Sequence, residues 1–206
     1  MYQMKSTLPV LCLASVSPRR RELLAQIGVR HVVAGADVDE AARSGEAPRD
    51  YVVRMAQEKA LAIRSRGEAL PVLAADTTVV LDDVIYGKPR DRADGIAMLG
   101  RLSGRMHEVL TAVALADERG IAMRLSVSEV RFCKLTPEQC AAYWDTGEPR
   151  DKAGGYAIQG FGAVFIESLR GSYSGVMGLP LFETAELLDA AGIPYWDVSG
   201  RAGARR

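Results

Sequence analysis

Residues 71–81 read PVLAADTTVVL, a run that is nearly continuous in apolar and β-branched side chains. Such a run predicts an interior β-strand that is covered on both faces. Asp82 and Asp83 then form a turn, and residues 84–86 return as a hairpin partner. Before the strand, apolar residues recur at three- and four-residue steps over 51–64, which predicts a helix packed against the sheet.

The rest of the chain continues this interleaving of strands and helices. Ser17, Pro18 and Gly28 are typical of the N-cap, first position and stop of a helix. The predicted class is therefore α/β, and an antiparallel pair within 107–134 makes the sheet mixed. The further predicted strands are 10–14, 31–34, 107–116, 121–134 and 163–169, the last within a Gly-rich segment 154–178, and the further helices are 91–102, 136–145 and 181–191.

The composition is that of an ordinary globular protein. The 206 residues include 26 Lys and Arg and 26 Asp and Glu, so the net charge is zero, and 48% of residues are hydrophobic. This balance argues against disorder and against a protein that coats nucleic acid. No stretch approaches the ~20 apolar residues of a membrane span. The apolar run at 8–14 is too short for a signal peptide, and the three cysteines form no CxxC pair, so we expect a cytoplasmic protein.

Residues 15–21 (SVSPRRR) place three arginines in the first turn of a helix that follows a strand. Cations are unfavourable at this end of a helix dipole, whereas free backbone N–H groups there favour an anion. Together with the hydroxyls of Ser15 and Ser17, the stretch predicts a phosphate site. The alternative is a solvated basic turn, and at least one of the arginines is expected on the surface.

Asp76 stands inside the apolar strand 71–81. Burial of a carboxylate costs several kcal/mol unless a cation, a metal or a hydrogen-bond donor meets it. Carboxylates in such places are often general bases or metal ligands. The alternative is a structural aspartate at a strand bulge, held by backbone N–H groups.

Two further segments are weaker signals. The turn 87–91 (GKPRD) places Lys88 near the same sheet edge as Asp76, where a lysine can hold phosphate, although its spacing is not that of a P-loop. The Gly-rich segment 154–178 permits close backbone approach to a ligand, and its Gln159 can contact a base edge through the amide. A plain set of tight turns is the alternative there. Two histidines cannot form a His-rich zinc site.

In this order the motifs resemble the Maf family of nucleoside triphosphate pyrophosphatases, over roughly residues 10–190. The forms AIQG and GSYS resemble the subfamily that acts on dTTP and UTP. The stretches that carry the resemblance are 13–20 (LASVSPRR), 75–77 (ADT), 87–89 (GKP), 102–104 (LSG) with His107, 156–160 (YAIQG), 171–174 (GSYS) and 178–181 (GLPL).

The resemblance implies an elongated mixed sheet flanked by helices, with two lobes around a central cleft, as in Maf and ITPase-like folds. The sequence predicts one domain over 8–197 with a C-terminal tail at 198–206, and the resemblance implies a homodimer. It also implies hydrolysis of dTTP or UTP to the monophosphate and pyrophosphate with Mg²⁺ or Mn²⁺. The implied roles are general base for Asp76, phosphate contacts for Ser15, Arg19, Arg20, Lys59 and Lys88, an acidic or metal position for Glu40 beside Asp76, and base selection for Arg19, Thr77 and Gln159.

A protein of another class could use the same residues. A nucleotide-binding regulator, for instance one acting in septum formation, would keep the arginines and glycines and need no base. Asp76 distinguishes the two, because a protein that only binds has no reason to bury a carboxylate in this strand. CTP and modified pyrimidine triphosphates remain alternatives to dTTP and UTP as substrates.

Overall fold

A computed structural model describes residues 8–196 of the chain. Its centre is a seven-stranded mixed sheet of order β2-β1-β3-β5-β6-β7, with β4 paired to β3. The pairs β1–β2 and β1–β3 are parallel, and the other pairs are antiparallel. The strands are β1 (Leu11–Leu13), β2 (His31–Val33), β3 (Val72–Leu81), β4 (Val84–Tyr86), β5 (Met106–Asp117), β6 (Gly120–Phe132) and β7 (Ile166–Arg170).

The helices begin at recognisable local signals. Pro18 occupies the first turn of α1 after Ser17, and the Asp91 side chain accepts from the Asp94 N–H at the start of α3. Thr136 and Gln139 form a capping box on α4. The helices are α1 (Pro18–Gln26), α2 (Pro48–Arg64), α3 (Arg92–Leu102), α4 (Pro137–Asp145), α5 (Tyr173–Met177) and α6 (Leu181–Ala191), with 3-10 turns η1 (Glu148–Asp151), η2 (Ala153–Gly155) and η3 (Phe161–Phe165).

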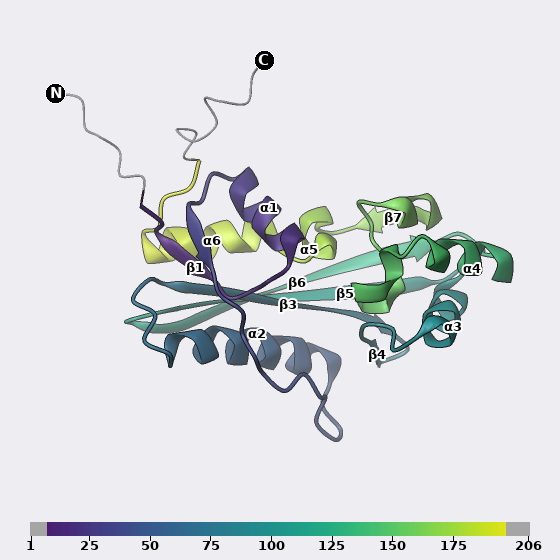
Figure 1. Ribbon diagram of the computed structural model, residues 1–206, viewed down its shortest axis with the longest axis horizontal. Helices are drawn as coiled ribbons and strands as arrows, with labels where there is room; N and C mark the ends of the chain where they lie inside the picture. Colours follow the sequence, from purple (N-terminus) through teal and green to yellow (C-terminus); the bar gives the residue numbers. More distant parts are fainter. Residues whose placement is uncertain (1–7, 197–206) are drawn as a thin grey trace, which may run out of the picture.

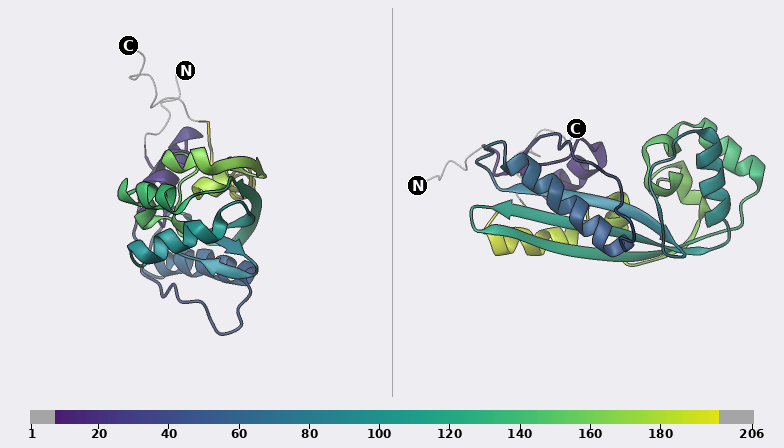
Figure 2. Two further views of the ribbon diagram at one scale, coloured as in Figure 1. Left: turned by 90° about the vertical axis from the view of Figure 1, so that its right-hand side faces the viewer. Right: turned by 90° about the horizontal axis from the view of Figure 1, so that it is seen from below.

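Two lobes lie at the two ends of the long strands β3, β5 and β6, which run through both (Figure 1). In the first lobe, α1 and α6 cover one face of the sheet and α2 covers the other. The second lobe contains α3, α4 and the 3-10 turns (Figure 2). The elongated mixed sheet with flanking helices confirms the predicted α/β class.

The core follows the two-residue period of β3, whose successive side chains point to opposite faces. Leu73 and Ala75 pack in the cluster under α1 and α6, whereas Val72 and Ala74 pack in the cluster under α2. A third cluster fills the second lobe around the fully buried Phe132. Because both faces of β3 are covered, its apolar run is continuous, as the sequence predicts.

The largest departures from the predicted elements are at α2, β7 and α5. Helix α2 begins at Pro48 rather than at residue 51, because a proline is favourable in the first turn. Residues 161–165 form a 3-10 turn, so the strand expected at 163–169 lies at 166–170. Residues 173–177 form the short helix α5 where the sequence suggested turns. The tail predicted at 198–206 lies outside the described residues.

Over residues 8–196, the helices include none with the length and apolar character needed to cross a bilayer.

Candidate active site

A pocket of about 420 Å³ opens beside β3. On this side β3 pairs with β1 at Val72 and Leu73 and with β4 from Val79 to Leu81. Among residues 8–196, no strand pairs with β3 on that edge between these two pairings, and Asp76, Thr77 and Thr78 line the pocket there. Side chains from both faces of β3 therefore reach one cavity.

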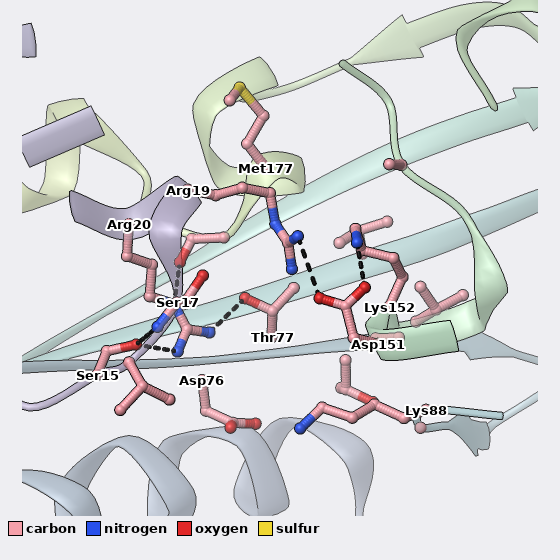
Figure 3. Close-up of a pocket in the computed structure, with 18 of the residues that line it drawn as sticks. Ser15, Ser17, Arg19, Arg20, Asp76, Thr77, Lys88, Asp151, Lys152 and Met177 are labelled. Atoms are coloured by element: carbon pink, nitrogen blue, oxygen red, sulfur yellow. Dashed lines mark hydrogen bonds and ion pairs between the residues drawn. The ribbon is translucent and has the colours of Figure 1, made fainter. Parts of the chain in front are cut away.

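The start of α1 forms one wall of the pocket. Arg20 Nε donates to the Gly178 carbonyl at 2.8 Å, and its two terminal nitrogens lie 3.4 Å from Ser15 Oγ and 3.3 Å from Thr77 Oγ1. Figure 3 shows the Arg20 fork held between Ser15 and Thr77. Burial lowers the pKa of Arg20, and the Asp76 carboxylate opposes that shift. Arg21 is exposed and does not line the pocket, as expected for one of the three arginines.

The Asp76 side chain points to the face of β3 opposite to that of Thr77, toward α2. Its Oδ1 accepts from Lys59 Nζ at 2.7 Å, and Asp76 is 8% exposed. The same ammonium lies 2.6 Å from Glu40 Oε1, so one lysine holds two carboxylates. Asp76 pairs in regular register with Ala112 of β5, so the strand-bulge alternative was wrong. The cation that compensates the buried carboxylate is Lys59.

Glu40 reaches this cluster from the loop before α2. Burial raises the pKa of Glu40, but the hydrogen bond and charge of Lys59, together with the charge of Lys88, outweigh it and lower the pKa overall. Tyr51 supports the loop, since its hydroxyl donates to the Glu40 carbonyl at 3.0 Å. Glu40 is therefore ionised at neutral pH beside Asp76.

The second lobe supplies the facing wall. Lys88 is exposed and extends into the pocket after β4 (Figure 3). Arg19 lies 3.5 Å from Asp151, which also pairs with Lys152. The contact between Arg19 on α1 and Asp151 on η1 joins the two lobes across the pocket.

Thr77 of β3 and Gln159 of the second lobe both line the pocket. The Thr77 hydroxyl is 3.1 Å from that of Thr111, which donates to the Gly175 carbonyl at 2.8 Å. Gln159 is exposed and lines the pocket from the loop between η2 and η3. The Thr77 hydroxyl is thus held in place by its neighbours.

All nine residues predicted for the site line this one pocket. Tyr51, Asp151 and Lys152 also line the pocket and were not predicted from the sequence. Asp151 and Lys152 could have been found from their place immediately before the Gly-rich segment. Tyr51 carries no such signal, because an aromatic residue in the first turns of an amphipathic helix is ordinary.

The charges of the pocket favour a polyanion. Five cationic side chains and three carboxylates line it, leaving two positive charges. Within the described part of the chain, no group of three or more His, Cys, Asp or Glu side chains is placed to hold a metal ion. Glu40 and Asp76, which share Lys59, are nevertheless a fitting donor set for Mg²⁺, which binds through one or two carboxylates together with substrate phosphates.

Curated relatives are similar to nearly the whole chain. A dTTP/UTP pyrophosphatase of Alkalilimnicola ehrlichii is 56% identical over 193 residues, covering 91% of this chain and 95% of the relative. The protein of the same name from Saccharophagus degradans is 54% identical over 190 residues, covering 90% of each chain. The solved Staphylococcus aureus Ham1 protein is similar with TM-score 0.44 and 14% identity over 76% of this chain and 79% of that one. Residues 10–191 match the family described as Maf-like protein, and the chain belongs to that family.

Proposed function

We propose that this protein is a nucleoside triphosphate pyrophosphatase that hydrolyses dTTP and UTP to the nucleoside monophosphate and pyrophosphate. The observation that carries the proposal is a buried carboxylate, Asp76, at an open strand edge that faces a set of cationic side chains. The printed names of relatives at 54% and 56% identity support the substrate class.

In this proposal the triphosphate lies along the cationic wall. Arg19, Arg20 and Lys88 contact phosphate oxygens from two sides, and Ser15 and Lys59 complete the set. Arg20 suits this role because its planar fork presents several N–H groups in one direction. The same residues neutralise charge that develops on the leaving pyrophosphate.

Asp76 acts as the general base. Its carboxylate takes a proton from the water that attacks the α-phosphate, and the bond between the α- and β-phosphates breaks. Lys59 Nζ, at 2.7 Å from Asp76 Oδ1, holds the carboxylate in orientation before substrate arrives.

We also propose a divalent cation, Mg²⁺ or Mn²⁺, held by Glu40 and Asp76. A triphosphate carries about four negative charges, and the pocket lining supplies two net positive ones, so a divalent ion brings the charges into balance. When bound, such an ion polarises phosphate oxygens and lowers the pKa of water. A chelator is expected to abolish turnover, and added Mg²⁺ or Mn²⁺ to restore it.

Base selection is assigned to Arg19, Thr77 and Gln159. The Gln159 amide both donates and accepts hydrogen bonds, which suits the edge of a pyrimidine. CTP and modified pyrimidine triphosphates differ from UTP by small groups, and a pocket separates such ligands by about 1–3 kcal/mol unless a polar contact is involved. They are therefore included among the proposed substrates.

The experiment is a panel of canonical and modified nucleoside triphosphates with Mg²⁺ or Mn²⁺, scored for monophosphate and pyrophosphate. Turnover concentrated on dTTP and UTP is the expected result. Turnover concentrated on a purine triphosphate would overturn the base assignment. Tight nucleotide binding without turnover would favour the regulator.

Residues 8–197 are proposed as one domain, because β3, β5 and β6 run through both lobes. The homodimer and the cytoplasmic location stay predictions.

A further inference from the structure

A carboxylate outside the pocket holds the loop that carries Gln159. Glu148 Oε2 accepts from the Phe161 N–H at 3.0 Å, and its Oε1 accepts from the Gly162 N–H at 3.0 Å. Glu148 begins η1 and does not line the pocket. These contacts fix the chain just after Gln159.

Tyr143 of α4 fixes the chain just before Gln159. Its hydroxyl accepts from the Ala157 N–H at 3.0 Å and donates to Glu148 Oε1 at 2.6 Å. Tyr143 is buried, and its ring meets that of Phe165 edge to face at 5.0 Å. Glu148 and Tyr143, which are hydrogen-bonded to each other, therefore hold the chain on both sides of Gln159.

The glycines of this loop are explained by the same contacts. A Cβ on Gly160 would lie 1.9 Å from Glu148 Oε2, and a Cβ on Gly162 would lie 2.7 Å from the Tyr143 hydroxyl. Only glycine lets the backbone approach these two side chains so closely. The glycines were predicted to permit close approach of a ligand, whereas at these two positions they permit the close approach of Glu148 and Tyr143.

Glu148 is charged when it makes these contacts. Burial raises the pKa of Glu148, but hydrogen bonds from Tyr143 and from two backbone N–H groups outweigh it and lower the pKa overall. A carboxylate has acceptor oxygens only, so it matches three donors at once. An amide of the same size would turn an NH₂ group toward one of them.

We propose that Glu148 is a positioning residue that, together with Tyr143, fixes Gln159 and thereby sets the preference for a pyrimidine base. This inference rests on the proposed function, in which Gln159 contacts the base. Hydrogen-bond selection requires that the amide be held within a fraction of an ångström, and a loop held at only one side does not achieve this. The phosphate contacts come from other elements. Arg19 pairs with Asp151 of η1, whereas Ser15, Arg20, Lys59 and Lys88 supply contacts that do not depend on Glu148.

The test compares Glu148→Gln with the wild type. We expect a roughly ten- to hundredfold fall in kcat/KM for UTP, mainly through KM, and a smaller preference for UTP over GTP. Inhibition by inorganic tripolyphosphate, which has no base, should be unchanged. Glu167→Gln is the matched control: Glu167 lies in the same lobe, half exposed and paired with Arg131. Weakened tripolyphosphate inhibition together with weakened UTP turnover would point to a general structural role and overturn the proposal.

Gln159→Ala, introduced into the wild type and into Glu148→Gln, tests whether Glu148 acts through Gln159. If it does, the double variant turns over UTP no worse than Gln159→Ala alone. A double variant in which the losses of kcat/KM from Glu148→Gln and Gln159→Ala multiply would overturn the proposal. Tyr143→Phe is a second, milder variant, since it removes the acceptor for Ala157 and keeps the ring. It should shift the UTP preference in the same direction.

Amide hydrogen exchange over residues 157–162 separates this inference from the proposed function. Glu148→Gln should increase exchange in this segment and leave the exchange of β5 unchanged. Unaltered exchange would overturn the positioning role whatever the substrate. Increased exchange in a protein whose wild type hydrolyses no nucleotide would overturn the proposed function and, with it, the role in base preference.

Discussion

Lys59 Nζ lies 2.7 Å from Asp76 Oδ1, and the two side chains are only 10% and 11% exposed. The pair joins the C-terminal half of α2 to the middle of β3, so a helix and the strand that follows it in the chain share one charge pair. Its burial makes it consequential for stability, because removal of one partner leaves the other as an uncompensated charge.

Lys59→Met should therefore lower the free energy of unfolding by about 3 kcal/mol. Addition of Asp76→Asn should recover part of this loss, because the uncompensated carboxylate is then gone. Urea unfolding measures both effects. Arg92→Met removes an exposed pair with Asp145 and should change stability by less than about 1 kcal/mol. A Lys59→Met protein as stable as the control would contradict the prediction.

Asp76→Asn should lower kcat at least about a hundredfold and leave the nucleotide affinity measured without divalent cation nearly unchanged. The amide cannot accept the proton of water, whereas the cationic wall of the pocket is intact. Steady-state turnover of UTP and calorimetric binding of UTP are the two measurements. A variant with nearly wild-type kcat would show that another group is the base.

Lys88 and Arg20 should respond differently to truncation. Within residues 8–196, Lys88 makes no hydrogen bond or ion pair, whereas Arg20 contacts the Gly178 carbonyl, Ser15 and Thr77. Lys88→Ala is thus expected to raise KM without changing the melting temperature, and Arg20→Ala to raise KM and lower the melting temperature together.

Arg20→Lys should not restore the wild-type KM, because a point charge cannot reproduce a planar fork that meets three acceptors. Kinetics and thermal melts on the same preparations check this. Equal melting temperatures for Lys88→Ala and Arg20→Ala would argue that the Arg20 contacts do not hold α1 in place.

His107 predicts a loss of stability in mild acid. It is 2% exposed, its Nε2 lies 2.9 Å from the Tyr156 hydroxyl, and burial lowers its pKa to about 4 from 6.5. In the unfolded chain His107 is protonated below about pH 6.5, whereas in the folded chain it is protonated only below about pH 4. Stability should therefore fall by about 3 kcal/mol as pH drops through this interval.

His107→Gln removes the titration, so its unfolding free energy should depend less steeply on pH between 6.5 and 4 than that of the wild type. Urea unfolding at several pH values tests the difference. If the unfolding free energies of the wild type and of His107→Gln depend on pH equally steeply through this interval, His107 titrates normally in the folded protein, contrary to the prediction.

Local sequence was sufficient for most elements. The apolar run at 71–81 indicates a strand covered on both faces, and Ser17, Pro18 and Gly28 mark the ends of the helix α1, because these signals act over one or two turns. Helix α5 was missed because it has five residues, one of them glycine, and its cap at Ser172 is lost in a Gly-rich segment. Short elements depend on packing more than on their own propensity.

The site divides in the same way. A buried Asp76 and a basic first turn after a strand are visible in the sequence, because each is unfavourable without a ligand or partner. That all nine predicted residues surround one pocket was decided by the open edge of β3 between β1 and β4. No local pattern shows which strands end before their neighbour does.

The partners of the buried charges were also decided by the tertiary structure. Lys59 lies 17 residues from Asp76 in the chain, and Glu148 lies 13 residues from Phe161, whose N–H donates to it. The sequence by itself determined that a carboxylate in this strand needs a cation or a donor, since that follows from the cost of burial. Which side chain meets it depends on how helix and sheet pack, because contacts between elements are made only when the chain is folded.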